Sequence, residues 1–361
     1  MTRLAAARVV TPQGVLEPGT VVIDGDRIVA VEPGDSSPAD EAFGGTLAPG
    51  FVDLQVNGLG PVDVASADAS TWAELDRRLV ASGVTAWCPT LVSSPLDAYD
   101  APLSAIAAAA ARDGAVPAVL GAHLEGPFLG GAPGAHRRDH VVPLDSDWLL
   151  AVCERWPVRI VTLAPELAGA ADVVRALDAR GVTVALGHST ASYEDAVAAV
   201  DAGARLVTHC FNGMAPLHHR EPGLVGAALS DERLVVSLIA DLVHVHPAAL
   251  AIACRAKGRG GYVLVSDAVA WEGDSDAPRL ADGTLAGSAL MLDRAVANVV
   301  AHAGVSLVDA IDAASTAPAR LVGAYDRGRI EAGCRADLVL LDASLRVLGT
   351  WIGGEPAGDQ P

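Results

Sequence analysis

The sequence predicts an α/β fold: a TIM-type (β/α)8 barrel that carries a small β-sandwich domain formed by both chain ends. Through the middle of the chain, short apolar runs alternate with Ala-rich helical stretches, whereas both ends are rich in strand-forming residues and turn signals. Because 361 residues exceed what such a barrel needs, the remaining length fits an accessory domain. We therefore expect residues 49–324 to form the barrel, and residues 1–48 and 325–361 to form the small domain.

The strands expected in the small domain are short β-rich segments separated by Gly, Pro and Asp. They lie at residues 7–11, 20–24 and 27–31 near one end of the chain and at residues 336–341 and 347–352 near the other. No low-complexity linker separates them from the middle of the chain. This distribution favours one small sheet domain built from both ends.

Eight β/α units follow one another in the middle of the chain. The expected strands are apolar runs typical of buried parallel strands, at residues 51–56, 84–91, 119–124, 159–164, 183–186, 205–209, 235–240 and 262–266. The expected helices include residues 70–82, 98–113, 170–180, 192–202 and 247–257, with further helical segments near 289–303 and 307–314. Eight such units in series indicate a closed barrel, in which catalytic residues lie at the carboxyl ends of the strands.

The third expected strand ends in His123-Leu124-Glu125, after which Gly126-Pro127 turns the chain into a loop. Alternation puts His123 and Glu125 on the same side of this strand. A carboxylate at the end of a buried strand is costly unless a metal ion, a cation or a substrate compensates its charge. Glu125 is therefore a candidate metal ligand, provided that other strands supply partners.

Two other strand ends supply these partners, His188 and His209. One carboxylate and two imidazoles leave a fourth coordination position for water, as in catalytic zinc sites. The first strand carries Gln55 and Asn57, whose amides rarely bind zinc, so we expect one divalent metal ion per subunit. Zinc is the ion we favour, although iron or another divalent ion also fits this donor set.

Asp267, at the end of the last strand, is the expected general acid/base. A carboxylate beside a metal-activated water can accept its proton and later return it to a leaving amine. The alternative is that Asp267 only orients a metal ligand.

The composition restricts the partners and the compartment. A net charge of −19 without a basic stripe argues against nucleic acid as a partner, and an anionic substrate would need local positive groups. No apolar run reaches the roughly 20 residues of a membrane span, and the first residues do not resemble a signal peptide. Five scattered cysteines without CxxC spacing are typical of a reducing compartment. We expect a cytoplasmic protein that acts on a small molecule and has no membrane partner.

Six segments together resemble the N-acetylglucosamine-6-phosphate deacetylases of the amidohydrolase superfamily. They are residues 123–128 (His-Leu-Glu-Gly-Pro-Phe), 187–189 (Gly-His-Ser), 208–214 (Thr-His-Cys-Phe-Asn-Gly-Met), 220–223 (Arg-Glu-Pro-Gly), 265–268 (Val-Ser-Asp-Ala) and 285–288 (Leu-Ala-Gly-Ser). The resemblance runs in the same order through most of the chain. It depends above all on Glu125 together with residues 220–223.

The resemblance implies roles for the matching residues in the reaction. Glu125, His188 and His209 would bind the metal ion, and Asp267 would be the acid/base. Ala135 and His136 would contact the substrate, and His136 would polarise the acetamide carbonyl; His140 is the alternative to His136. The sugar phosphate would be held by Asn212, Gly213, Arg220, His244, Leu285, Ala286 and Gly287.

The resemblance also implies a homodimer, because in this family some phosphate contacts come from a neighbouring subunit. Arg220 offers bidentate recognition of a phosphate. His218 and His219 beside it either add positive charge for the phosphate or are simply exposed loop residues, and we favour the second alternative. Leu242 stands where the family usually has Gly, so the backbone before His244 is expected to differ.

The expected reaction is hydrolysis of N-acetyl-D-glucosamine 6-phosphate to D-glucosamine 6-phosphate and acetate. Two alternatives remain open. The first is a metal-dependent amidohydrolase for another N-acyl compound, such as an N-acetyl amino sugar phosphate of different stereochemistry. The second is a non-catalytic relative that binds a sugar phosphate, and an intact Asp267 and ligand set argue against it.

Overall fold

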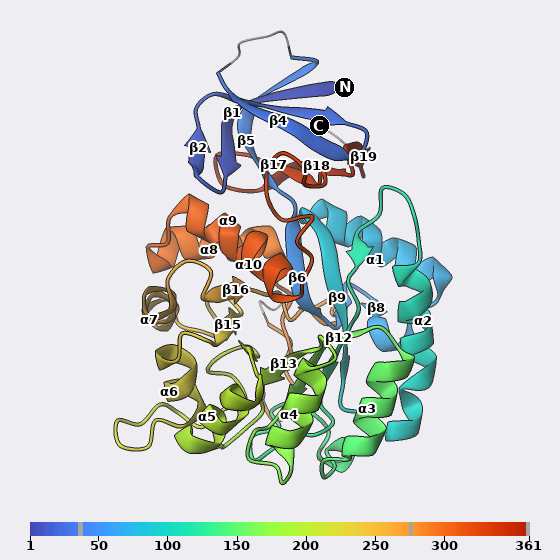
Figure 1. The fold of residues 1–361 in the computed structure, drawn as a ribbon, viewed down its shortest axis with the longest axis vertical. Coiled ribbons are helices and arrows are strands. Elements are labelled where there is room, and N and C mark those ends of the chain that lie inside the picture. Colours follow the sequence, from blue (N-terminus) through green and yellow to red (C-terminus); the bar gives the residue numbers. More distant parts are fainter. Residues whose placement is uncertain (35–38, 274–276, 359–361) are drawn as a thin grey trace.

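The computed structural model describes residues 1–34, 39–273 and 277–358. Both chain ends contribute to one sheet of eight strands, which lies above the rest of the molecule in Figure 1. Its strands are β1 (Thr2–Thr11), β2 (Gly14–Leu16), β3 (Gly19–Asp24), β4 (Arg27–Pro33), β5 (Glu41–Pro49), β17 (Leu338–Leu341), β18 (Val347–Ile352) and β19 (Glu355–Ala357). Their order is β19-β18-β17-β5-β1-β3-β4, with β2 paired to β1.

Strand β5 joins the two ends of the chain within this sheet, since it pairs in parallel with β1 and antiparallel with β17. The sequence did not predict β5 because Gly44 and Gly45 favour a turn. A side chain at Gly45 would collide with the carbonyl of Leu341 in the neighbouring strand, which explains the glycine. The sheet encloses a core of its own that includes Leu47 and Trp351. The expected division of the chain near residues 48 and 325 stays a prediction.

Eight parallel strands form the barrel in the order of the sequence. They are β6 (Phe51–Val56), β9 (Val84–Val92), β11 (Ala122–Glu125), β12 (Val158–Leu163), β13 (Thr183–Leu186), β14 (Leu206–Val207), β15 (Val235–Leu238) and β16 (Tyr262–Leu264), and the short β10 (Ala118–Val119) also pairs with β9. The segment after β16 closes the ring through a parallel bridge between Val56 and Ala268, and the Asp267 N–H donates to the Gln55 carbonyl (2.9 Å). The predicted barrel with a small β domain is confirmed.

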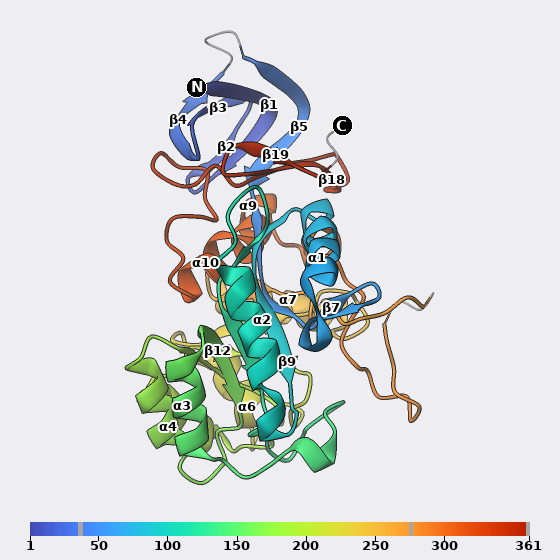
Figure 2. The same cartoon turned by 90° about the vertical axis from the view of Figure 1, so that its right-hand side faces the viewer.

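Helices cover the outside of the barrel and follow the strands one by one (Figures 1 and 2). They are α1 (Ala69–Ala81), α2 (Asp100–Ala110), α3 (Ser146–Arg155), α4 (Ala170–Asp178), α5 (Tyr193–Ala202), α6 (Gly223–Ser230), α7 (Pro247–Lys257), α8 (Leu292–Ala303), α9 (Leu307–Ala314) and α10 (Thr316–Leu321). The sequence did not predict α3, α6 and α10. Helix α6 contains Gly223 and Gly226, and α10 contains Pro318; glycine and proline inside a helix weaken the helical pattern.

A two-stranded hairpin, β7 (Gly58–Leu59) and β8 (Val62–Asp63), follows the first barrel strand. Within the described part of the chain, no helix has both the length and the apolar content that a bilayer crossing requires.

Several strands end earlier than expected at the rim of the barrel that carries the predicted site. Strand β14 stops at Val207 and β16 at Leu264, and the chain then leaves the extended conformation. His188, His209 and Asp267 have φ angles of 50°, 31° and 49°, in the left-handed region that non-glycine residues rarely adopt. Such conformations cost roughly 1–3 kcal/mol each and concentrate at functional sites. Their position at three strand ends marks this rim as the functional face.

Candidate metal centre

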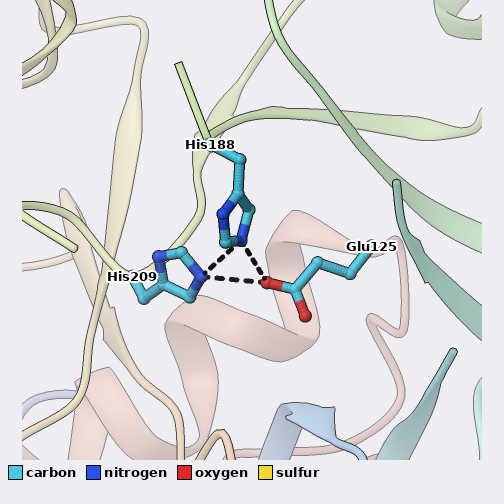
Figure 3. Close-up of side chains that lie close together, drawn as sticks. All are labelled: Glu125, His188 and His209. Atoms are coloured by element: carbon cyan, nitrogen blue, oxygen red, sulfur yellow. Dashed lines mark hydrogen bonds and ion pairs between the residues drawn. The ribbon is translucent and has the colours of Figure 1, made fainter. Parts of the chain in front are cut away.

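Glu125, His188 and His209 come together at the carboxyl ends of three barrel strands. Glu125 is the last residue of β11, and the two histidines follow β13 and β14. The Oε1 atom of Glu125 lies 3.0 Å from Nε2 of His188 and 2.9 Å from Nε2 of His209, and the two Nε2 atoms are 3.1 Å apart. Figure 3 shows the three side chains pointing toward one common centre. All three residues are buried.

This arrangement fits a divalent metal ion. Ligand atoms about 2.0–2.1 Å from a tetrahedral ion stand roughly 3.3 Å apart, close to the spacing of these three atoms. Two imidazole nitrogens that face each other and one carboxylate oxygen form a poor set of mutual hydrogen bonds, but they are a common ligand set for zinc. Among the described residues, this is the one cluster of His, Cys, Asp or Glu side chains that could hold a metal ion.

The surroundings of Glu125 favour its ionised form, which can bind a cation. Burial alone would raise the pKa of Glu125, but hydrogen bonds from His188 and His209 and the electrostatic influence of the two rings hold this pKa well below its usual value. Glu125 therefore carries the negative charge that a divalent ion needs in a buried site.

Asp267 lies in the same cavity and is held by the two amides of the first barrel strand. The Nε2 atom of Gln55 donates to Oδ1 of Asp267 and to Oε1 of Glu125 (3.0 Å each), and Nδ2 of Asn57 donates to Oδ1 of Asp267 (2.8 Å). Gln55 thus connects the two carboxylates, and Asn57 supplies a second donor to Asp267. The sequence excluded them as metal ligands but did not reveal this bridging contact.

The pKa of Asp267 is raised to about 8, first by burial and then by the negative charge of Glu125. A divalent cation bound next to Asp267 would oppose this rise, because it favours the ionised carboxylate. With an ion bound, Asp267 is thus expected to be ionised and able to accept a proton from water.

A cavity of about 550 Å³ opens onto the three candidate metal ligands, Glu125, His188 and His209. Its walls contain most of the substrate-binding residues that the family resemblance implies. They are Ala135, His136, Asn212, Gly213, His244, Leu285, Ala286 and Gly287. Glu125, His188, His209 and Asp267 also line this cavity.

Arg220 is the exception, because it does not line this cavity. It lies on an exposed loop, where its guanidinium contacts Nε2 of His219 (2.8 Å). Instead, Arg220 borders a separate cavity of about 450 Å³ together with Tyr193 and Glu194. The structure of one chain therefore does not bring Arg220 to the predicted metal ligands.

The two loop histidines occupy different places. The ring of His136 lies against that of His188, with 4.4 Å between the ring centroids, and burial together with His188 lowers its pKa to about 3. The Nδ1 atom of His140 instead lies 3.2 Å from the carbonyl oxygen of Ser93. Both histidines line the cavity, but His136 is the one in contact with a predicted metal ligand.

His244 is fixed by Asp241, a residue to which the sequence analysis gave no partner. The Oδ2 atom of Asp241 accepts from Nδ1 of His244 (2.7 Å), and Oδ1 accepts from the backbone N–H groups of Val243 and His244. Leu242 has a φ of 68°, so this non-glycine residue adopts the backbone conformation that a glycine favours. A D-x-x-H spacing could have suggested this pair.

His123, which the sequence placed on the same side of the strand as Glu125, is not one of the candidate metal ligands. Its ring is buried and lies 3.0 Å from the Leu54 carbonyl and 2.8 Å from Oγ1 of Thr162. Burial lowers its pKa to about 4, so the ring is neutral. His123 is a hydrogen-bonded residue of the barrel interior.

Asp53 is a buried carboxyl below the site that the sequence did not single out. It accepts hydrogen bonds from the backbone N–H groups of Gln55 and Ser266 (3.2 Å each), yet burial raises its pKa from 3.8 to about 6. The folded protein therefore binds this proton more tightly than the unfolded chain does. The stabilisation is complete below about pH 3.8 and is lost as the pH rises through about 6.

We expect the free energy of unfolding of the wild type, relative to Asp53→Asn, to fall by about 2.4 kcal/mol between about pH 4 and about pH 7. The asparagine keeps an oxygen for the two backbone donors but has no proton to lose. Denaturant unfolding of both proteins across this range measures the difference. Parallel stability curves would contradict the assigned pKa.

The comparisons with known proteins begin with sequence. Residues 46–358 match the amidohydrolase family. The chain is 40% identical to an N-acetylgalactosamine-6-phosphate deacetylase of Escherichia coli O157:H7, in a match that covers 98% of both chains. It is also 40% identical to the N-acetylglucosamine-6-phosphate deacetylase of Bos taurus, over 93% of this chain and 89% of the bovine protein.

Solved structures agree with these relatives. An N-acetyl-D-glucosamine-6-phosphate deacetylase of Mycobacterium smegmatis, in which an aspartate is replaced by alanine, has been solved in complex with N-acetyl-D-glucosamine 6-phosphate. It superposes with a TM-score of 0.93 at 33% identity and covers 99% of each chain. A Xaa-Pro dipeptidase with a TM-score of 0.69 and 16% identity shares the fold alone.

Proposed function

The chain belongs to the amidohydrolase family, and we propose that it hydrolyses the acetamide of N-acetyl-D-glucosamine 6-phosphate to give D-glucosamine 6-phosphate and acetate. The observation that carries the proposal is the convergence of Glu125, His188 and His209 in one cavity with Asp267. Near-complete matches to deacetylases of amino sugar phosphates supply the substrate class.

Each functional residue of the cavity has a separate role in the proposed reaction. Glu125, His188 and His209 would hold one divalent ion, for which we propose zinc. When bound, such an ion polarises a carbonyl oxygen and makes water more acidic. Asp267 accepts the proton of the attacking water and returns it to the amino nitrogen as the carbon–nitrogen bond breaks. His136 donates a hydrogen bond to the acetamide oxygen, where negative charge develops.

The phosphate group would be held by residues from two chains. Asn212, Gly213 and His244 line the cavity of their own chain, whereas Arg220 lies outside it. We propose that Arg220 reaches the cavity of a neighbouring subunit, which makes the functional unit a homodimer. Because its net charge is −19, the protein needs such local cations to bind an anion.

Arg220→Ala is expected to raise KM for the 6-phosphate substrate by about 10- to 100-fold, the range of one lost charge-assisted hydrogen bond. The kcat should change little, and so should turnover of the sugar without phosphate. Arg220→Lys should restore binding only in part, because an ammonium group cannot form the bidentate contact. Steady-state kinetics with both sugars measure these effects, and equal changes for the two would exclude phosphate recognition by Arg220.

A hybrid dimer tests the contribution from the second chain directly. Co-expression of Arg220→Ala with Asp267→Asn gives dimers in which one cavity combines an intact Asp267 with an intact Arg220 from the partner. We expect about half of the wild-type kcat with a wild-type KM in such hybrids. A KM that stays at the value of Arg220→Ala would show that Arg220 acts within its own chain or not at all.

A second candidate substrate differs only in the configuration at carbon 4 of the sugar. N-acetyl-D-galactosamine 6-phosphate is favoured by the 40% identity to the deacetylase of Escherichia coli O157:H7. Acetate release from both sugar phosphates, and from the same sugars without phosphate, decides between them. Release from neither phosphate would overturn the proposed function.

We also propose that the protein works in the cytoplasm. All five cysteines are free thiols in the structure, and none is paired in a disulfide, which fits a reducing compartment. Fractionation of cells that produce the protein, with deacetylase activity as the readout, tests this proposal.

A further inference from the structure

Ser93 connects the two histidines of the loop that follows β11. It comes directly after β9 and is 4% exposed. Its backbone N–H lies 3.2 Å from Nδ1 of His136, and its Oγ lies 2.9 Å from the same nitrogen. Its carbonyl oxygen lies 3.2 Å from Nδ1 of His140. One buried serine therefore contacts His136 with two atoms and His140 with a third.

These contacts determine which ring nitrogen carries the proton. A backbone N–H can only donate, so Nδ1 of His136 accepts and has no proton. The neutral ring then carries its proton on Nε2. A carbonyl oxygen can only accept, so Nδ1 of His140 is protonated and donates to Ser93.

We propose that Ser93 and His140 are positioning residues of the deacetylation. Ser93 holds His136 in the tautomer with its proton on Nε2, and His140 holds the peptide of Ser93 in place. This inference rests on the proposed function, in which His136 faces the acetamide. In this proposal His140 acts indirectly, by holding Ser93, whereas His136 lies next to the candidate metal ligand His188.

The tautomer restricts what His136 can do in the cavity. A protonated Nε2 can donate a hydrogen bond to a carbonyl oxygen, but it cannot accept a proton from water. The role of base is thereby left to Asp267, which lines the same cavity. A donor that is fixed before the substrate binds stabilises the developing negative charge without reorganisation during the reaction.

The surroundings of Ser93 hold it in position. The hydroxyl of Tyr99 donates to the carbonyl of Val92 (3.1 Å) and accepts from the N–H of Ser94 (3.2 Å). These two hydrogen bonds hold the backbone on both sides of Ser93. Gly126, with a φ of 87°, lies next to the Ser93 hydroxyl, and a side chain at Gly126 would collide with it. The segment is therefore rigid enough to orient a ring.

The first test compares two amides that differ in their need for polarisation. The substrates are N-acetyl- and N-trifluoroacetyl-D-glucosamine 6-phosphate, because the fluorines already withdraw electrons from the carbonyl. For His140→Leu we expect kcat with the acetamide to fall by about 10-fold, the lower end for loss of an outer hydrogen-bond partner. Ser93→Ala loses the hydroxyl contact but keeps the backbone N–H that donates to Nδ1 of His136, so we expect a smaller fall in kcat for this variant. The loss with the trifluoroacetamide should be clearly smaller, and KM should change little for both.

Three further variants separate positioning from a general structural effect. His140→Asn keeps an N–H donor near the place of Nδ1 and should recover most of the activity that His140→Leu loses. Ser104→Ala and His302→Leu, at exposed positions on α2 and α8, should behave as the wild type. Equal losses on the two amides, or wild-type activity of both Ser93→Ala and His140→Leu, would overturn the proposal.

The second test does not depend on turnover. In zinc-loaded protein with ¹⁵N-labelled histidine, the ring nitrogen spectrum of His136 should show a bare Nδ1 and a protonated Nε2. The proton on Nδ1 would overturn the inference. If the wild type cleaves neither amide, the proposed function fails, whereas the spectrum still reports which ring nitrogen of His136 carries the proton.

Discussion

Replacing Asp267 with asparagine is expected to lower kcat for the acetylated sugar phosphate by about 10²- to 10⁴-fold, the usual contribution of a general acid/base. Asparagine keeps an oxygen that can accept from Gln55 and Asn57, so the cavity should keep its shape. It cannot take a proton from water or return one to the leaving nitrogen. Acetate release under saturating substrate measures the loss, and bound metal should remain at the wild-type content.

The control for this variant is Asp113→Asn, at an exposed position away from the cavity, which should have wild-type kcat. Two results would contradict the assigned role of Asp267. A kcat close to that of the wild type would remove it from proton transfer. Loss of the metal ion in Asp267→Asn would make it a support of the metal site instead.

Replacing Glu125 with glutamine is expected to abolish tight metal binding and to lower kcat by more than about 100-fold, which exceeds the usual effect of losing an outer hydrogen-bond partner of a ligand. The amide has nearly the size of the carboxylate, but it lacks the negative charge that His188 and His209 stabilise in the buried site. Amide groups are also rare ligands of zinc. Metal content per chain and acetate release, measured on the same sample, report both effects.

Glu154→Gln, at an exposed position on α3, is the matched control and should keep both the metal ion and the activity. If Glu125→Gln retained one tightly bound ion per chain, the cluster of Glu125, His188 and His209 would not be the metal site. If it lost the ion but kept its activity, the reaction would not need the metal.

The barrel could be predicted from the sequence because its buried strands are apolar runs of the right length. The expected strand at 183–186 and the expected helix at 247–257 have the same bounds as β13 and α7. The strand expected at 205–209 was too long, because His209 adopts a left-handed backbone conformation that residue type does not signal. The strand expected at 262–266 also ends early, at Leu264, shortly before the left-handed Asp267. The double glycine of β5 similarly looks like a turn until its neighbour, Leu341, is known.

The positions of the candidate ligands could be predicted because parallel strands bring their carboxyl ends to one rim. This geometric rule places Glu125, His188 and His209 on the same face before any distance is known. A hydrogen-bond partner such as Ser93 for His136, 43 residues away in the chain, follows from loop conformation, which the sequence does not determine. The location of Arg220 outside its own cavity also depends on the tertiary structure.

The most direct test of the proposed metal site is to add a divalent ion back to metal-stripped protein. It shows whether one ion at Glu125, His188 and His209 supports deacetylation. Acetate release from N-acetyl-D-glucosamine 6-phosphate should be negligible after chelation and should rise with added zinc to a plateau at one ion per chain. Full activity in protein that contains no metal, or a plateau only at two ions per chain, would contradict the single-metal site.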